Sequence, residues 1–100
     1  METKIITLTP NEKKSEDIYF NNGQVSYKIS EFLTDNTNAH NEDQSAGFFI
    51  YEFFNNEQGE NKKPFTYKNI NKDLTIESEL AGIYFELNGT NEVSFKVNIS

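Results

Sequence analysis

The feature that most constrains the fold of this chain is the alternation of apolar and polar side chains in its C-terminal segment, residues 82–100. Apolar side chains occupy every second position in two runs, which are separated by the polar segment 88–92. A period of two is that of a β-strand with one buried face, whereas a helix repeats every ~3.6 residues. The segment therefore predicts two strands and a connecting turn. The alternating apolar residues are Ile83, Phe85 and Leu87 in the first run and Val93, Phe95, Val97 and Ile99 in the second.

The length of the turn decides which side chains would face each other in a hairpin of these two strands. A two-residue turn at Asn88-Gly89 would mix the apolar and polar faces. A loop over 88–92 keeps the apolar faces together, and a bulge can have the same effect. The pattern therefore predicts a hairpin with the longer loop, in which Leu87 pairs with Val93, Phe85 with Phe95 and Ile83 with Val97.

Shorter runs with the same period predict further strands, bounded by turn-forming Asn, Gly and Pro residues. Residues 17–20 and 24–30 flank the turn at 21–23 and predict a first hairpin. The segment 55–64 is a turn-rich connection, and a short helix over 71–80 is the alternative to a strand at 73–77. The predicted strands span 3–8, 17–20, 24–30, 47–54, 65–69, 73–77, 83–87 and 93–99.

These strands predict an all-β fold, a single antiparallel β-sandwich or jelly-roll-like domain of about eight strands over residues 1–100. A chain of 100 residues has the length of one domain. The core of such a small domain gains from the large side chains of nine Phe and five Tyr. The polar tract 34–46 lacks an apolar pattern and predicts a long loop, which is either disordered or a crossover.

The charge of the chain restricts its partners. The net charge is −7, and all nine basic residues are Lys. This balance disfavours nucleic acid and acidic membrane surfaces, leaves a basic protein partner open, and also serves solubility alone. The chain has no Cys, and we see no signal peptide or membrane-spanning segment, so a cytoplasmic or virion-associated location is expected.

The polar tract holds the only His of the chain, His40, together with Asp35, Glu42 and Asp43. A lone His excludes a site built on a His pair, and a catalytic relay needs an orienting scaffold that a mobile loop lacks. The loop oxygens could bind calcium, although they lack the EF-hand spacing. A solvated acidic loop is the alternative.

Two mid-strand carboxylates, Glu52 and Glu86, are placed where a glycosidase pair would project, or where Glu commonly faces solvent. Surface tyrosines could stack on sugars, or they could belong to the core. Because no residue set combines a nucleophile with a positioned base, the sequence predicts no catalytic, cofactor-binding or metal-binding residues. The tyrosines considered for sugar binding are Tyr19, Tyr51, Tyr67 and Tyr84.

The most apolar window of the chain, residues 47–54, predicts a strand with two apolar faces. Glu52 fits poorly in a dry core, so the face that carries it is expected to point outward. The opposite face then supplies Phe49, Tyr51 and Phe53 to the core. Three large apolar residues are left outside as a predicted interaction patch, unless another segment covers them. This patch consists of Phe48, Ile50 and Phe54.

The strand chemistry resembles that of the bacterial pre-peptidase C-terminal (PPC) type of β-sandwich module. The matching segments are Gly23-Gln-Val-Ser-Tyr-Lys-Ile29, Ala81-Gly-Ile-Tyr-Phe85 and Val93-Ser-Phe-Lys-Val97. The resemblance implies a sandwich whose Gly-x-Tyr strand pairs with the final strand. Modules of that family are usually appended to secreted proteases, and this chain shows neither a protease nor a secretion signal.

The combined observations predict a non-enzymatic protein–protein interaction or structural module, or a self-associating one. In its most concrete form this is a small bacteriophage virion component, such as a capsid decoration or tail-associated subunit. A carbohydrate- or cell-envelope-binding module is the first alternative, with a glycan as the partner. An acidic inhibitor or immunity protein that masks a basic surface is the second.

Overall fold

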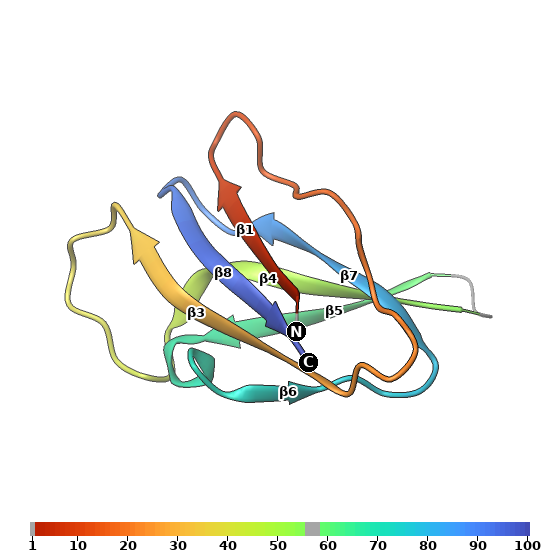
Figure 1. The fold of residues 1–100 in the computed structure, drawn as a ribbon. Coiled ribbons are helices and arrows are strands. Elements are labelled where there is room, and N and C mark those ends of the chain that lie inside the picture. The colour runs from red at the N-terminus through yellow and green to blue at the C-terminus, as the bar shows by residue number, and fades with distance from the viewer. Residues whose placement is uncertain (1, 56–58) are drawn as a thin grey trace.

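Two four-stranded antiparallel sheets pack face to face in the structure, a computed structural model that describes residues 2–55 and 59–100 (Figure 1). Sheet A has the strand order β1-β8-β3-β6, and sheet B has the order β2-β7-β4-β5. The predicted all-β sandwich is therefore confirmed. The strands are β1 (Glu2–Leu8), β2 (Ile18–Tyr19), β3 (Ser26–Thr34), β4 (Ser45–Phe54), β5 (Glu60–Thr66), β6 (Asp73–Thr75), β7 (Leu80–Leu87) and β8 (Val93–Ile99), and one 3₁₀ turn, η1, spans Tyr67–Asn69.

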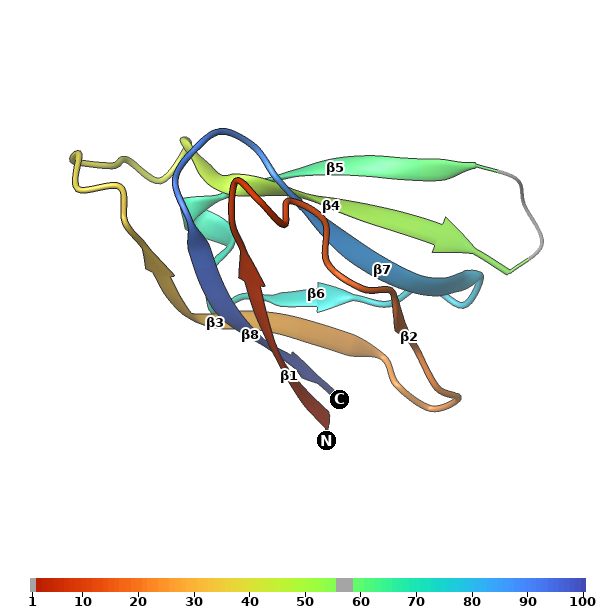
Figure 2. The ribbon, with the colours of Figure 1, turned by 90° about the horizontal axis from the view of Figure 1, so that it is seen from above.

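The strand pairs are those of a jelly roll. β1 pairs with β8, β2 with β7, β3 with β6 and β4 with β5, as in one long hairpin whose two arms run side by side. The contacts of β3 with β8 and of β4 with β7 then roll this hairpin into two sheets. Figure 2 shows the sheets as two layers, with the termini together at the edge of sheet A.

The predicted pairing of the two C-terminal strands is wrong. The loop 88–92 has the predicted length, but it carries the chain from β7 in sheet B to β8 in sheet A. The apolar faces of the two strands meet across the core instead, where the rings of Phe85 and Phe95 lie edge to face at 4.9 Å between centroids. The alternation of apolar and polar residues determines which side of a strand is buried, but it does not determine which strand lies next to it in the sheet.

The predicted first hairpin is also wrong. The turn at 21–23 is present, with Gly23 at a φ of 89°, but it connects β2 in sheet B to β3 in sheet A. β3 begins at Ser26 and continues to Thr34 through a bulge at Glu31, whose φ is 50°. The bulge reverses the alternation, so that Phe32 packs against the core and Leu33 is 70% exposed.

The core lies between the sheets and is centred on Phe48. Its ring contacts the rings of Phe32, Phe65, Phe85 and Phe95, at centroid distances between 4.5 and 6.2 Å. β8 buries every second residue, as its alternation predicts. This aromatic centre gives a small domain much of its buried apolar surface.

The predicted orientation of β4 is wrong. Phe48 and Ile50 are 0% and 2% exposed, and Phe54 is half-buried against the core, so these residues form no exposed patch. Glu52 shares their inward face, near the end of the β4–β5 hairpin, where Asn61 and Lys63 of β5 reach its carboxylate. One partnered charge at the edge of the sandwich is thus compatible with an inward face that is otherwise apolar.

The connection predicted at 55–64 is shorter in the structure, and part of it, residues 56–58, lies outside the described residues. β5 begins at Glu60, before the predicted strand, and ends at Thr66. Its sequence, Glu-Asn-Lys-Lys-Pro, is typical of turns, and it is tolerated because β5 is the edge strand of sheet B. Asp73–Thr75 is a strand as predicted, and the alternative helix over 71–80 is not present.

The polar tract is a crossover from sheet A to sheet B, which was one of the two predicted possibilities. β3 extends to Thr34 and β4 begins at Ser45, so the loop is shorter than predicted. The amides of Tyr67 and Lys68 bond the carbonyls of Gln44 and Glu42 and hold the loop against η1.

Candidate functional site

The outer surface of sheet B carries a row of aromatic side chains from three adjacent strands. Each of them alternates with an inward-facing residue, so all point away from the core. We call this surface the aromatic face. It consists of Tyr19 of β2, Tyr84 of β7, and Phe49, Tyr51 and Phe53 of β4.

The centre of the aromatic face is a tyrosine pair. Tyr51 and Tyr84 are direct neighbours in the register of β4 and β7, and their rings stack in parallel at 4.8 Å with an angle of 4°. The Tyr51 hydroxyl donates to Oε1 of Glu86 at 3.0 Å, and the Tyr84 hydroxyl donates to Oε2 of Glu60. Both phenols are therefore fixed by carboxylates of the same sheet, Tyr51 by one on the adjacent strand β7 and Tyr84 by one on β5, across β4.

The environment favours the neutral form of both phenols. Burial raises the pKa of Tyr84 and of Tyr51, and the hydrogen bonds to Glu60 and Glu86 raise both pKa values further. The two hydroxyls thus remain donors at neutral pH. Each carboxylate uses one oxygen in these bonds, and within residues 2–55 and 59–100 no side-chain hydrogen bond reaches its second oxygen.

Two lysines cover ring faces of the aromatic face. Lys14 Nζ lies 4.3 Å from the centroid of Tyr84, and Lys62 Nζ lies 4.0 Å from the centroid of Phe49. Lys14 is held there because the segment before β2 bonds the edge of β7, with the Ser15 amide donating to the carbonyl of Phe85. Tyr84 is consequently buried between a lysine and Tyr51.

Gly82 brings the remaining two rings together. It is the register partner of both Tyr19 and Phe53, whose rings meet edge to face at 5.4 Å. A Cβ atom on Gly82 would lie 2.3 Å from the carbonyl oxygen of Ile18 and 2.5 Å from the ring of Phe53. Only a glycine therefore lets β2 and the ring of Phe53 approach β7 so closely.

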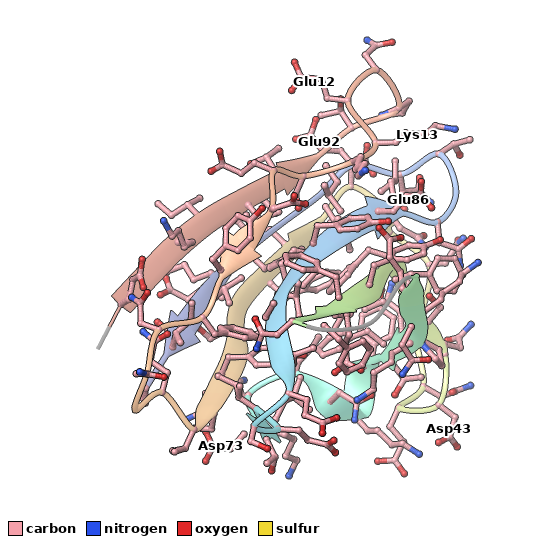
Figure 3. All side chains as sticks on the ribbon, turned by 90° about the vertical axis from the view of Figure 1, so that its right-hand side faces the viewer. Glu12, Lys13, Asp43, Asp73, Glu86 and Glu92 are labelled. Atoms are coloured by element: carbon pink, nitrogen blue, oxygen red, sulfur yellow. The ribbon has the colours of Figure 1, made fainter. Side chains whose placement is uncertain are left out.

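The predicted carboxylate pair is not brought together. Glu86 lies on the outer surface of sheet B beside Tyr51, whereas Glu52 points to the inner side of the same sheet. The sheet separates them, so the pair cannot flank one glycosidic bond. Figure 3 shows Glu86 on β7, well apart from Asp43 and Asp73.

The predicted residues of the polar tract lie at another end of the molecule. His40 stacks on Tyr67 of η1 at 4.5 Å, so Tyr67 does not belong to the aromatic face. Asp43 pairs with Lys68 at 3.2 Å. Within residues 2–55 and 59–100, no group of three or more acidic or His side chains is arranged to hold a metal ion.

Sequence reasoning assigned Phe49 and Phe53 to the core, and it considered Tyr19, Tyr51 and Tyr84 without placing them on one surface. Their common location depends on the orientation of β4 and on the pairing of β2 with β7. The local pattern of apolar and polar residues determines neither the orientation of β4 nor the pairing of β2 with β7.

Comparison with protein-family models, with curated proteins and with solved structures finds no match to this chain. In the part of the chain that the structure describes, no helix is long and apolar enough to cross a membrane.

Proposed function

We propose that this chain is a non-enzymatic module that binds another protein through the aromatic face. The observation that carries the proposal is the gathering of aromatic side chains on the solvent side of sheet B, where the core does not require them. Aromatic residues are enriched in protein interfaces because they offer a large rigid contact area with a polar end. Tyr19, which is 64% exposed, is the most accessible member of the set.

The covered ring faces favour a protein over a sugar as the partner. A sugar stacks on the flat face of a ring, and Lys14, Lys62 and Tyr51 occupy faces of Tyr84 and Phe49. Ring edges, carboxylates and ammonium groups are left for contact, which suits a mixed protein surface. A glycan is the second candidate, because Tyr19, Tyr51 and Tyr84 share this face.

The charge of the chain favours a basic partner over a second copy of itself. Two copies with a net charge of −7 repel each other, whereas a basic surface is attracted. In its most specific form, the partner belongs to a bacteriophage particle, and the chain is a capsid decoration or tail-associated subunit. The jelly-roll strand order supports this at the level of the fold alone, because viral capsid proteins and lectins both use it.

The test is direct binding of a purified partner. A protein captured with the wild-type chain is purified, and its affinity is measured by calorimetry for the wild type, Tyr19→Ala and Ile5→Ala. Ile5 is the matched control, because it is similarly exposed, at 71%, on the outer surface of sheet A. Tyr19→Ala is expected to weaken binding by about tenfold or more, as interface aromatics do, and Ile5→Ala to leave it unchanged.

A partner whose affinity depends on Ile5 and not on Tyr19 would contradict the proposal. A glycan array probed with the same variants tests the second candidate, which requires binding that Tyr19→Ala abolishes. Identification of the partner as a basic toxin or enzyme would instead point to an inhibitor or immunity protein.

A further inference from the structure

A polar cleft opens on the other side of β4, between the β4–β5 hairpin and the segment that follows β6. Figure 2 shows β4 and β5 reaching past the end of β6. The cleft has a volume of about 170 Å³. Its lining includes Glu52, Asn61, Lys63, Phe54, Glu77 and Leu80.

The carboxylate of Glu52 forms one wall of this cleft and has unused acceptor capacity. The residue is only 9% exposed, and from the residues that the structure describes it accepts one hydrogen bond, from Nδ2 of Asn61 to Oε1 at 3.2 Å. Its second oxygen is 3.6 Å from Nζ of Lys63, which is longer than a hydrogen bond. An ionised carboxylate offers about four acceptor positions, and a buried one is stabilised when donors fill them.

The other residues that line the cleft are suited to a long side chain that has an aliphatic stem and a cationic head. Phe54 is half-buried and Leu80 is buried, so together they offer apolar contact to an aliphatic stem. Glu77 adds a second carboxylate to the same cleft and is itself exposed to solvent. A charged head beside Glu52 would therefore be enclosed by negative charge.

We propose that this cleft binds an arginine side chain of a partner protein. A guanidinium group is planar and can donate to both oxygens of one carboxylate, whereas an ammonium group acts as a point charge. The chain contains no Arg of its own, and Lys63 occupies the position loosely. Because the Lys63 side chain is 49% exposed, it can turn into water when a better donor arrives.

A phenol of the core also responds to the charge of Glu52. Burial, and next the charge of Glu52, raise the pKa of Tyr27, so this neighbour stays neutral and does not compete for the cation. The net charge of −7 attracts basic partners to the molecule as a whole. The cleft and the aromatic face lie on opposite sides of sheet B, so this inference stands independently of the proposed function.

The experiment titrates the ¹⁵N-labelled protein with the peptide acetyl-Gly-Arg-Gly-amide and follows the backbone amides by NMR. Saturable shifts are expected at Glu52, Asn61 and Leu80, with half-saturation at about millimolar concentration, as suits one side chain. The same peptide with citrulline has the same shape without the charge, and it is expected to cause no saturable shift. A peptide with Lys is expected to bind several-fold more weakly than the Arg peptide.

Two variants of the acidic residues locate the interaction. Glu52→Gln is expected to weaken binding by about tenfold or more, because it removes a charge-assisted hydrogen-bonded pair. Glu86→Gln changes the same type of residue on the outer side of the same sheet, and it is expected to leave binding unchanged. Equal shifts with the citrulline peptide, no saturable shift, or unchanged binding to Glu52→Gln would each overturn the inference.

A third variant keeps the test decisive if Glu52→Gln does not fold. Lys63→Gln removes the cation that competes for Glu52 and leaves the cleft otherwise intact. Its affinity for the Arg peptide is expected to rise by several-fold. A loss of affinity in this variant would mean that Lys63 helps to form the site, which contradicts the proposal.

Discussion

The outer surfaces of the two sheets differ although both sheets pack on the same core. Sheet A presents hydroxyl and amide groups that bond one another across β1, β8 and β3. The Thr3 hydroxyl donates to Asn98 at 3.2 Å, and Asn98 in turn donates to the Ser30 hydroxyl at 2.7 Å. Sheet B presents the aromatic face in the corresponding position, with the phenols of Tyr51 and Tyr84 bonded to carboxylates.

The aromatic side chains on the outer surface of sheet B are not needed to form the core of the sandwich. A sandwich of this kind needs one buried face per strand, and the outer surface of sheet A is otherwise mostly polar, with the apolar side chains Ile5 and Leu33 exposed singly on it. Sheet B instead keeps large rings on the outer side of its strands, and Gly82 allows them to pack together. A surface that groups its rings in this way gains free energy when a partner covers it.

The largest expected effect is a loss of stability on truncation of a side chain on the inner side of β4, compared with one on its outer side. Phe48→Ala is expected to lower the free energy of unfolding by about 3–5 kcal/mol, because it empties the centre of the core. Phe49→Ala removes the same side chain from the aromatic face and is expected to cost about 1 kcal/mol. Urea unfolding of both variants measures the difference. A larger loss for Phe49→Ala would mean that β4 has the opposite orientation.

A smaller effect is expected at the contact between β2 and β7. Gly82→Ala is expected to destabilise the protein by about 2 kcal/mol, as overpacking does, because its Cβ atom would displace β2 or the ring of Phe53. Amide exchange should then accelerate first at Ile18 and Tyr19. Thr7→Ala, on the outer surface of sheet A, is the control and is expected to cost less than about 0.5 kcal/mol. An equal loss of stability in Gly82→Ala and Thr7→Ala would show that the outer side of sheet B is no more tightly packed than that of sheet A.

The smallest effect is expected from pH and is tested at the phenol of Tyr84 on sheet B. Because the pKa of Tyr84 is raised in the folded state, its contribution is complete below the unfolded value of about 10 and declines as the pH rises beyond it. Tyr84→Phe should therefore make the decline of stability above that pH shallower, whereas Thr7→Val should not. Urea unfolding at several alkaline pH values measures the slopes. An unchanged slope in Tyr84→Phe would show that its phenol does not titrate differently on folding.

The sequence alone predicts the fold class because alternation is a local property. The strand β8 buries Val93, Phe95, Val97 and Ile99 as its period of two requires. Its neighbours, β1 and β3, are distant in sequence, and no local pattern selects them over β7. Hairpins were therefore predicted at two places where the chain passes from one sheet to the other.

The candidate site could be predicted only in part, because it depends on the orientation of one strand. Both faces of β4 are rich in aromatic residues, and the single charge at Glu52 decided the prediction in the wrong direction. The charge lies inside because the hairpin reaches beyond β6 and because β5 supplies Asn61 and Lys63. The sequence predicts residues 60–64 of β5 as part of a turn-rich connection, so it gives no polar partners for Glu52.

The pairing of β1 with β8 also sets when the molecule can fold. Glu2 lies opposite Ile99, and β8 is the strand between β1 and β3. Sheet A therefore cannot form as described until β8 has left the ribosome. Contacts between residues so far apart close slowly, on a timescale of about milliseconds to seconds. During synthesis the aromatic strand β4 emerges well before β7 and β8, and its nascent form therefore has to be kept from other chains until the last strand arrives.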